Sequence, residues 1–187
     1  MLKSSNYAPS ADLAEIIARH YVFSVELPED YEIIDSLLAE TPFIRVLIAG
    51  GWTGESAPGE WTGVGPMVFF GANSRPYRVR VKGSFHVIGV AFCPGGWRCL
   101  FDRPSSDYTD RMLALGDLWG QDSDELHREL VPLRRDDHAA AIAAIEGKAR
   151  QLLGRRKTVA PDAAMQQFEL IARNDSTIRV HDAADRI

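Results

Sequence analysis

The hydrophobic pattern of this chain changes its period near the middle. Up to Phe92, apolar residues alternate with polar ones or form short apolar runs, and both patterns are typical of β-strands. After Gly116, apolar residues recur at spacings of three and four, which is typical of amphipathic helices. Pro94–Gly96 interrupts the chain between the two parts. The pattern therefore predicts an α+β fold in which the strands come first and the helices last.

The first part predicts short strands separated by turns rich in glycine and proline, which favours an antiparallel sheet. The expected strands are 20–27, 43–49 with a continuation at 52–54 after a bulge, 61–63, 67–71, 77–82 and 85–92. In the run 77–82, alternation places Val79 and Val81 inward, and Gly83 with Ser84 predicts a tight hairpin before the next strand. We expect an antiparallel β-barrel or sandwich, and the mouth of a barrel can bind small ligands.

Three N-terminal segments carry weaker patterns. Residues 1–10 indicate a loose lead-in, and residues 11–18 fit a short helix. The segment 31–41 fits either a helix, through its isoleucine and leucine spacing, or an extended chain. These segments are expected to flank the sheet.

The second part predicts helices over 122–133, 136–153 and 161–173. The apolar face of the second helix fits packing against the sheet of the same chain, which we expect, or against a second copy. At the junction, Trp97, Leu100 and Phe101 have the spacing of a short helix that would lay large side chains over one end of the sheet. The strand part is thus followed by a helical segment.

Composition and charge limit the classes of function that the chain can have. Hydrophobic residues make up 45% of the chain and charged residues 25%, as in ordinary globular proteins. The net charge of -5 argues against this chain reading DNA by itself. No apolar run approaches the ~20 residues that span a bilayer, and no secretory signal pattern opens the chain, so we expect a cytoplasmic protein without a membrane partner. Cys93 and Cys99 are expected to be buried, reduced thiols.

The sequence does not predict a metal site, a cofactor or catalytic residues. A cupin-type metal site needs two histidines one residue apart and further ligands, whereas His86 stands alone on its strand and His20 is expected at the surface or at a sheet edge. No serine elbow or phosphate-binding loop is present. We therefore expect no enzyme. The alternative is a small metal-free cupin-like enzyme or isomerase, which turnover by the isolated chain would support.

A small-molecule site inside the sheet is the better hypothesis. Its candidate residues combine aromatic surface with a few polar groups, and each of them also fits an ordinary place in the core. They are Arg45, Trp52, Trp61, Phe70, Tyr77 and His86. Arg45 interrupts an apolar strand, so it either faces solvent or is placed to bind an anion such as a carboxylate.

Several motifs resemble a known family. They are YAPS at 7–10, HYVFSVELPE at 20–29, FFGANSRPYRVRVKGSFHVIGVAF at 69–92, PGGW at 94–97 and LGDLWG at 115–120. Together they resemble the N-terminal sensor domain in one branch of the AraC-type transcription regulators, across residues 7 to 155. The resemblance implies a cupin-like barrel with a helical tail, an unknown small-molecule effector and a possible homodimer.

The end of the chain resembles a second unit of the same family. The basic run 154–157 predicts a solvated hinge, and the helix 161–173, the extended link 177–180 and HDAADRI at 181–187 resemble the opening of the AraC-type helix-turn-helix module. We expect a sensor domain over 1–155, a linker and truncated DNA-binding domain over 156–187, and DNA binding through the missing part. The alternative is a short protein with a frayed tail.

Overall fold

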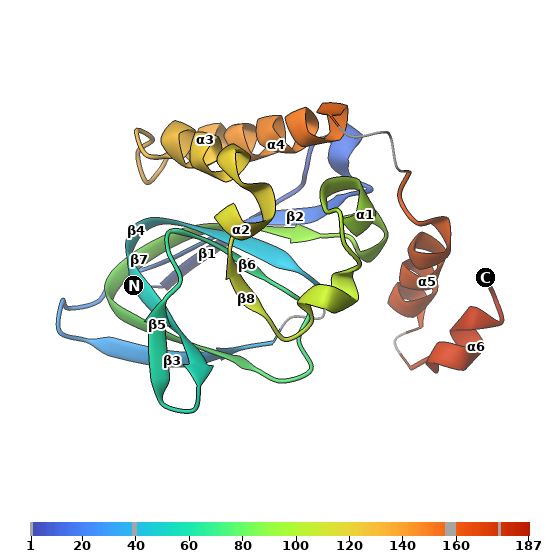
Figure 1. Cartoon of the computed structure of the whole chain (residues 1–187), viewed down its shortest axis with the longest axis horizontal. Helices are drawn as coiled ribbons and strands as arrows, with labels where there is room; N and C mark the ends of the chain where they lie inside the picture. Colours follow the sequence, from blue (N-terminus) through green and yellow to red (C-terminus); the bar gives the residue numbers. More distant parts are fainter. Residues whose placement is uncertain (1, 39–40, 156–159, 176) are drawn as a thin grey trace.

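The computed structural model describes residues 2–38, 41–155, 160–175 and 177–187 (Figure 1). Its strands form one antiparallel sheet in the order β1-β2-β7-β4-β6-β8, with β3 also pairing with β7 and β5 with β4. The strands are β1 (Leu2–Tyr7), β2 (Ile17–Val25), β3 (Glu32–Leu37), β4 (Phe43–Ala57), β5 (Glu60–Gly63), β6 (Met67–Phe70), β7 (Tyr77–Phe92) and β8 (Met112–Ala114). In the described ranges β1 and β8 do not pair, so the sheet is not closed into a barrel.

Helices follow the strands, which confirms the predicted α+β class. They are α1 (Trp97–Leu100), α2 (Gly116–Trp119), α3 (Gln121–Leu130), α4 (His138–Arg155), α5 (Ala163–Asn174) and α6 (Val180–Ala184), with 3-10 turns at Ala11–Leu13, Pro94–Gly96 and Ser105–Tyr108. Helices α3 and α4 lie over one face of the sheet, whereas α5 and α6 lie beyond α1 at its end (Figure 1). None of the described helices is long and apolar enough to cross a membrane.

Two long strands, β4 and β7, form the centre of the sheet and bend together. Gly50 has a φ of 95° and Gly83 a φ of 68°, a left-handed conformation that favours glycine. Between the pairs Ala49↔His86 and Gly51↔Lys82, one residue of β4 faces three residues of β7, which is a bulge. A Cβ atom on Gly50 would lie 2.5 Å from the Ser84 carbonyl oxygen. The bulge curves the sheet and makes one of its faces concave.

This bend corrects the predicted hairpin at Gly83. The chain does not reverse there, because β7 runs without interruption from Tyr77 to Phe92 and pairs with β4 on both sides of the bend. The glycine that indicated a turn instead allows a bulge inside one strand. The alternation around it was predicted correctly, since Val79 and Val81 are buried whereas Arg78 and Lys82 are exposed.

Other expectations for the strand part were wrong or incomplete. The lead-in 1–10 contains β1, which pairs with β2 along its whole length, and the helix expected over 11–18 is reduced to one 3-10 turn. The ambiguous segment 31–41 forms β3 over Glu32–Leu37, and β8 was not foreseen. Of the expected hinge, residues 154 and 155 belong to α4, and residues 156 and 157 lie outside the described residues.

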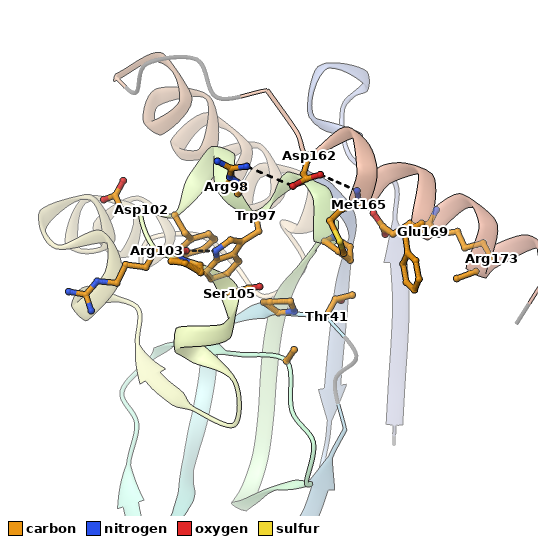
Figure 2. Close-up of a pocket in the computed structure, with 17 residues that line it drawn as sticks. Thr41, Trp97, Arg98, Asp102, Arg103, Ser105, Asp162, Met165, Glu169 and Arg173 are labelled. Carbon is orange, nitrogen blue, oxygen red and sulfur yellow. Dashed lines mark hydrogen bonds and ion pairs between the residues drawn. The ribbon is translucent and has the colours of Figure 1, made fainter. Parts of the chain in front are cut away.

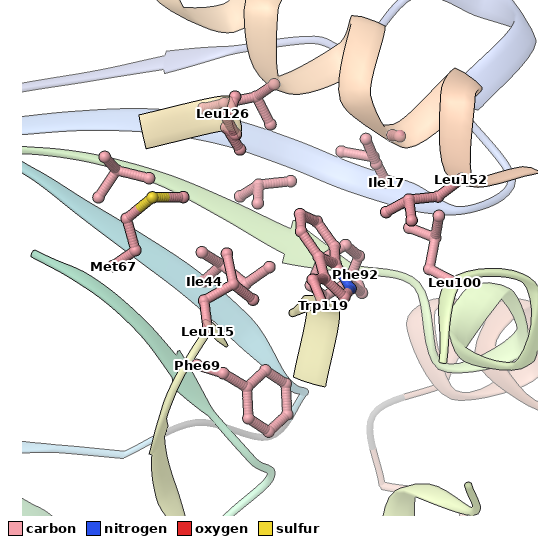
Figure 3. Close-up of a cluster of buried hydrophobic side chains, with 14 of the residues drawn as sticks. Ile17, Ile44, Met67, Phe69, Phe92, Leu100, Leu115, Trp119, Leu126 and Leu152 are labelled. Atoms are coloured by element: carbon pink, nitrogen blue, oxygen red, sulfur yellow. The ribbon is translucent and has the colours of Figure 1, made fainter. Parts of the chain in front are cut away.

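Hydrophobic side chains fill both faces of the sheet. On the helix-covered face, residues from β4, β6 and β7 pack against α2, α3 and α4, as Figure 3 shows for Ile44, Phe69, Trp119, Leu126 and Leu152. The concave face has its own cluster around Phe43, Trp52, Phe70, Val79 and Val81. The junction residues Trp97, Leu100 and Phe101 are buried as predicted, and the rings of Trp97 and Phe101 stack at 3.8 Å. Cys93 and Cys99 are buried and are not joined in a disulfide, as expected.

A buried polar contact fastens α4 to the sheet. The carboxylate of Glu146 accepts hydrogen bonds from the Ser10 amide at 2.9 Å, the Ser10 hydroxyl, Arg150 at 3.2 Å and His20 Nε2 at 3.0 Å. His20 was expected at the surface or at an edge, but it is fully buried beneath α4. These donors satisfy the carboxylate of Glu146, which is why a charged residue can occupy the buried face of α4.

We expect the two adjacent glycines of β4 to respond differently to alanine. Gly50→Ala forces a side chain into a left-handed backbone and against Ser84, so it should lower the free energy of unfolding by about 1–3 kcal/mol. At Gly51 a Cβ would meet nothing within 4 Å, so Gly51→Ala should stay within about 0.5 kcal/mol of wild type. Urea unfolding measures both. Equal losses would contradict the role given to the Gly50 bend.

Stability should fall as the pH drops below the ordinary histidine pKa of 6.5. Burial lowers the pKa of His20 although Glu146 opposes this, and burial together with His138 lowers the pKa of His86. Because both pKa values are lower in the folded state, the unfolded state binds protons first, and the stability present above pH 6.5 is lost below it.

The variant His20→Gln can still donate a hydrogen bond to Glu146 but does not titrate. We expect it to weaken the pH dependence of the unfolding free energy between pH 7.5 and 5.5, measured by urea unfolding at each pH (the window spans about one unit on either side of the ordinary pKa). His181→Gln, at an exposed position in α6, should keep the wild-type dependence. An unchanged slope in His20→Gln would count against this account.

Candidate ligand-binding cavity

A half-open cavity of about 1040 Å³ lies on the concave face of the sheet. Its walls come from β1, β2, β3, β4 and β7, and most of the side chains that line it are apolar. These include Phe23, Val25, Ile33, Phe43, Trp52, Val79, Val81, Phe85 and Val87. Small-molecule sites in proteins commonly measure ~300–1,000 Å³ and are mostly apolar with a few placed polar groups. The cavity therefore has the size and lining of a small-molecule site.

One row of three residues across the sheet carries two of the polar side chains on the cavity wall. Tyr21 on β2 and Arg45 on β4 are both paired with Gly89 of the strand between them, β7. A Cβ atom on Gly89 would overlap the Tyr21 ring. Because Gly89 has no side chain, the ring lies across β7, and Arg45 Nε donates a hydrogen bond to the Tyr21 hydroxyl at 3.1 Å.

Arg45 lies among aromatic rings. Its guanidinium carbon is 5.2 Å from the centroid of the Phe43 ring, 5.7 Å from that of Tyr21 and 5.8 Å from that of Phe70, which are cation–π distances. Across the described ranges, no carboxylate lies within ion-pair distance of Arg45. Burial raises the pKa of Tyr21 even though Arg45 and Arg19 oppose this, so its hydroxyl keeps its proton at neutral pH. The row thus offers a cation and a hydroxyl donor to the cavity.

The six sequence-predicted site residues do not all meet at this cavity. Arg45 and Trp52 line it. Phe70 and Tyr77 are buried in the cluster beneath it, where Phe70 stacks on Phe43 at 4.6 Å and the Tyr77 hydroxyl donates to the Arg111 carbonyl at 3.0 Å.

The other two candidates lie elsewhere on the sheet. The ring of Trp61 on β5 packs against the guanidinium of Arg80 at 4.1 Å, away from the cavity lining. His86 stacks on His138 of α4 at 5.5 Å, on the helix-covered face. Tyr21 was missed as a site residue. Its signal was Gly89, an inward position without a side chain in the middle of a buried strand, which indicates that another side chain occupies the space.

A second cleft, of about 1120 Å³, separates α5 from the α1 region (Figure 2). The Asp162 amide donates to the Gly95 carbonyl at 2.8 Å, and the Asp162 carboxylate caps α5 by accepting from the Met165 amide at 3.1 Å. Arg98 forms an ion pair with the same carboxylate at 3.8 Å. A Cβ on Gly95 would lie 2.9 Å from the Gln166 side chain, so glycine allows this close approach.

Helix α5 borders both cavities. Glu169 and Arg173, which form an ion pair at 3.3 Å, line the concave cavity and the α5 cleft alike, as does Thr41. No residue of α5 is buried, and Leu170 is 61% exposed. The helix therefore rests at the mouth of the concave cavity through few contacts.

Among the described residues, no three His, Cys, Asp or Glu side chains form a group that could hold a metal ion. The cavity wall is mostly apolar, and its polar side chains include the Arg45 guanidinium and the Tyr21 hydroxyl, which are joined by a hydrogen bond. This set can bind and orient a ligand.

The fold and the cavity together define the class of this domain. It is an α+β domain whose antiparallel sheet holds a cavity of a size that suits a small molecule. A family model described as a domain of unknown function (DUF6597) matches residues 5–114, more than half of the chain. The chain belongs to this family. The matched residues include β2, β3, β4 and β7, which form the cavity, and end before α5. No curated protein matches the chain.

Solved structures similar to the chain include ToxT from Vibrio cholerae, with 13% identity and a TM-score of 0.43, covering 89% of this chain and 69% of that one. ToxT from strain SCE256 with a bound unsaturated fatty acid has 12% identity and a TM-score of 0.43, covering 89% and 68%. The AraC-like transcriptional activator CuxR has 12% identity and a TM-score of 0.35, covering 96% and 74%.

We expect Gly89→Ala to break the contact between Tyr21 and Arg45, because the new methyl group takes the place of the Tyr21 ring. Such overpacking should lower the free energy of unfolding by about 1–3 kcal/mol in urea unfolding. In a Tyr21→Ala background the ring is gone, so the same substitution should cost nothing or stabilise the strand. A cost that is equal in both backgrounds would contradict the geometry of this row.

Proposed function

We propose that this chain is the effector-sensing part of an AraC-type transcription regulator, with residues 1–155 as the sensor and 156–187 as the link and the opening of a helix-turn-helix module. The effector is a small molecule that binds in the concave cavity, in contact with Arg45 and Trp52 and supported from beneath by Phe70 and Tyr77. Trp61 and His86 have supporting roles away from the cavity. DNA is bound by the module that follows. The helices provide the contact surface of a homodimer, and the protein acts in the cytoplasm.

The observation that carries this proposal is the position of α5. Its residues Glu169 and Arg173 border the cavity, and its N-terminal end contacts the rest of the domain through Asp162, which bonds to Gly95 and pairs with Arg98. A ligand whose contacts differ between docked and undocked α5 shifts the balance between these two states by its difference in affinity. The same linkage requires that the position of α5 changes the affinity for the ligand.

The net charge of -5 supports the assignment of ligand sensing and DNA binding to different parts of the protein. An acidic sensor does not read phosphate-rich DNA efficiently, so DNA contact belongs to the module that α5 and α6 begin. The loose packing of α5 suits a helix that changes position, because its displacement exposes little buried apolar surface.

The test uses two neighbouring isoleucines of β3 that point to opposite faces. Ile33 lines the cavity, whereas Ile34 is exposed on the other side. Ile33→Trp should fill the cavity, and Ile34→Trp is the matched control with the same change outside it. Chromatin immunoprecipitation of the tagged native protein from its source cells should recover discrete promoter regions. We expect Ile33→Trp to change occupancy at those regions and Ile34→Trp to leave it at the wild-type level.

Failure to enrich any DNA region would contradict the regulator role and favour the metal-free enzyme instead. Enrichment that is the same in wild type and Ile33→Trp would keep DNA binding but contradict the sensing role of the cavity. Both variants should be checked for folding by thermal unfolding before the comparison.

A further inference from the structure

We propose that the cavity binds a monocarboxylate with an apolar body, and that Arg45 and Tyr21 hold its carboxylate group. This inference rests on the proposed sensing function and names the chemical class of the effector. It is carried by the charge at the cavity wall, by the geometry of the row Tyr21–Gly89–Arg45 and by the lining of the remaining space.

The charge of the lining indicates a single negative charge on the ligand. The basic residues that line the cavity are Arg19, Arg45 and Arg173, and the acidic ones are Asp35 and Glu169, which leaves one positive charge in excess. Glu169 and Arg173 pair with each other, and Arg45 is half-buried without a carboxylate partner in the described part of the chain. A half-buried charge without a counterion is costly, and a bound anion removes that cost.

The geometry favours a planar carboxylate. Tyr21 accepts the hydrogen bond from Arg45 Nε, and neither terminal Nη group of Arg45 donates to an atom of the described residues. Both Nη groups can therefore make the paired hydrogen bonds that a carboxylate accepts. The Tyr21 hydroxyl proton has no protein acceptor among the described residues and can donate to the same carboxylate. The surrounding rings of Phe43, Tyr21 and Phe70 hold the guanidinium in place without competing for its donors.

The rest of the lining favours an apolar body over a sugar. Away from Arg45, most of the lining side chains are valine, isoleucine, leucine, tryptophan and phenylalanine, with fewer polar ones such as Asn6, Asp35 and Ser36. The indole N–H of Trp52 already donates to the Gly65 carbonyl at 3.0 Å. A polyol that lies against the apolar majority of these side chains would lose hydrogen bonds to water there. An aliphatic or aromatic body buries its surface there at about 25 cal/mol per Å².

The experiment compares straight-chain carboxylic acids from hexanoate to hexadecanoate with the primary alcohols of the same chain lengths. Isothermal titration calorimetry measures binding to the full chain below the micelle concentration of each probe. A hydrogen-bonded charge pair contributes enough for the best acid to bind about 10- to 100-fold more tightly than its alcohol. We expect Arg45→Met to lower the affinity for the acid to that for the alcohol and to leave the affinity for the alcohol unchanged. Tyr21→Phe should lower the affinity for the acid by a smaller factor.

Arg78→Met is the matched control, because Arg78 lies exposed on the outer face of β7 and should not affect either probe. Equal affinities of acid and alcohol for the wild type would overturn the carboxylate class while the cavity remains a ligand site. Weakening of the acid by Arg78→Met as much as by Arg45→Met would show a nonspecific charge effect and would also overturn it. Failure of every acid to bind would overturn it as well, while the chromatin experiment judges the sensing function separately.

Discussion

The pairing of β4 with β7 through a shared bend is the constraint on which the structure depends. Gly50 permits this bend, because any side chain there would meet the backbone of β7 at Ser84. The bend makes one face of the sheet concave and leaves the other face for α3 and α4. The cavity is therefore a consequence of backbone geometry, and the side chains that line it determine what the cavity can bind.

The concave face combines tight packing with one polar exception. Phe70 and Tyr77 form a floor that resists rearrangement, whereas the Tyr21–Gly89–Arg45 row crosses three strands and places a cation in apolar surroundings. A core that served stability alone would gain little from a half-buried arginine without a counterion. The loosely held α5 at the mouth of the same cavity connects this site to the end of the chain. The structure thus places a well-packed wall on one side of the cavity and the exposed helix α5 at its mouth.

Much of the fold could be predicted from the sequence, because alternation and turn residues are local signals. The strands around Phe43, Met67 and Val79 and the α+β order of elements follow from such signals. The failures have long-range causes: Gly83 supports a bulge that depends on β4, and β1 and β8 are strands because partners distant in sequence accept their hydrogen bonds. His20 is buried because Glu146 of α4 pairs with it, which no local pattern reveals.

The candidate site was predicted only in part, for a similar reason. Arg45 stood out because a charge within an apolar run is unusual, and it does line the cavity. Tyr21 did not stand out, because its role depends on the space left by Gly89. That space lies beside Tyr21 only because β2 pairs with β7 at this position. Trp61 on β5 and His86 on β7 are aromatic residues of the same sheet, but neither lines the cavity. A sequence pattern alone does not specify which neighbour each one meets.

The central claim is that occupancy of the cavity and the position of α5 are linked. Hydrogen–deuterium exchange of the full chain, with and without saturating decanoate, tests this claim most directly. The account predicts slower exchange in the strands that form the cavity together with a changed exchange rate in the amides of α5. Protection of the cavity strands with no change in α5 would show that ligand binding and helix docking are independent, and would contradict the account.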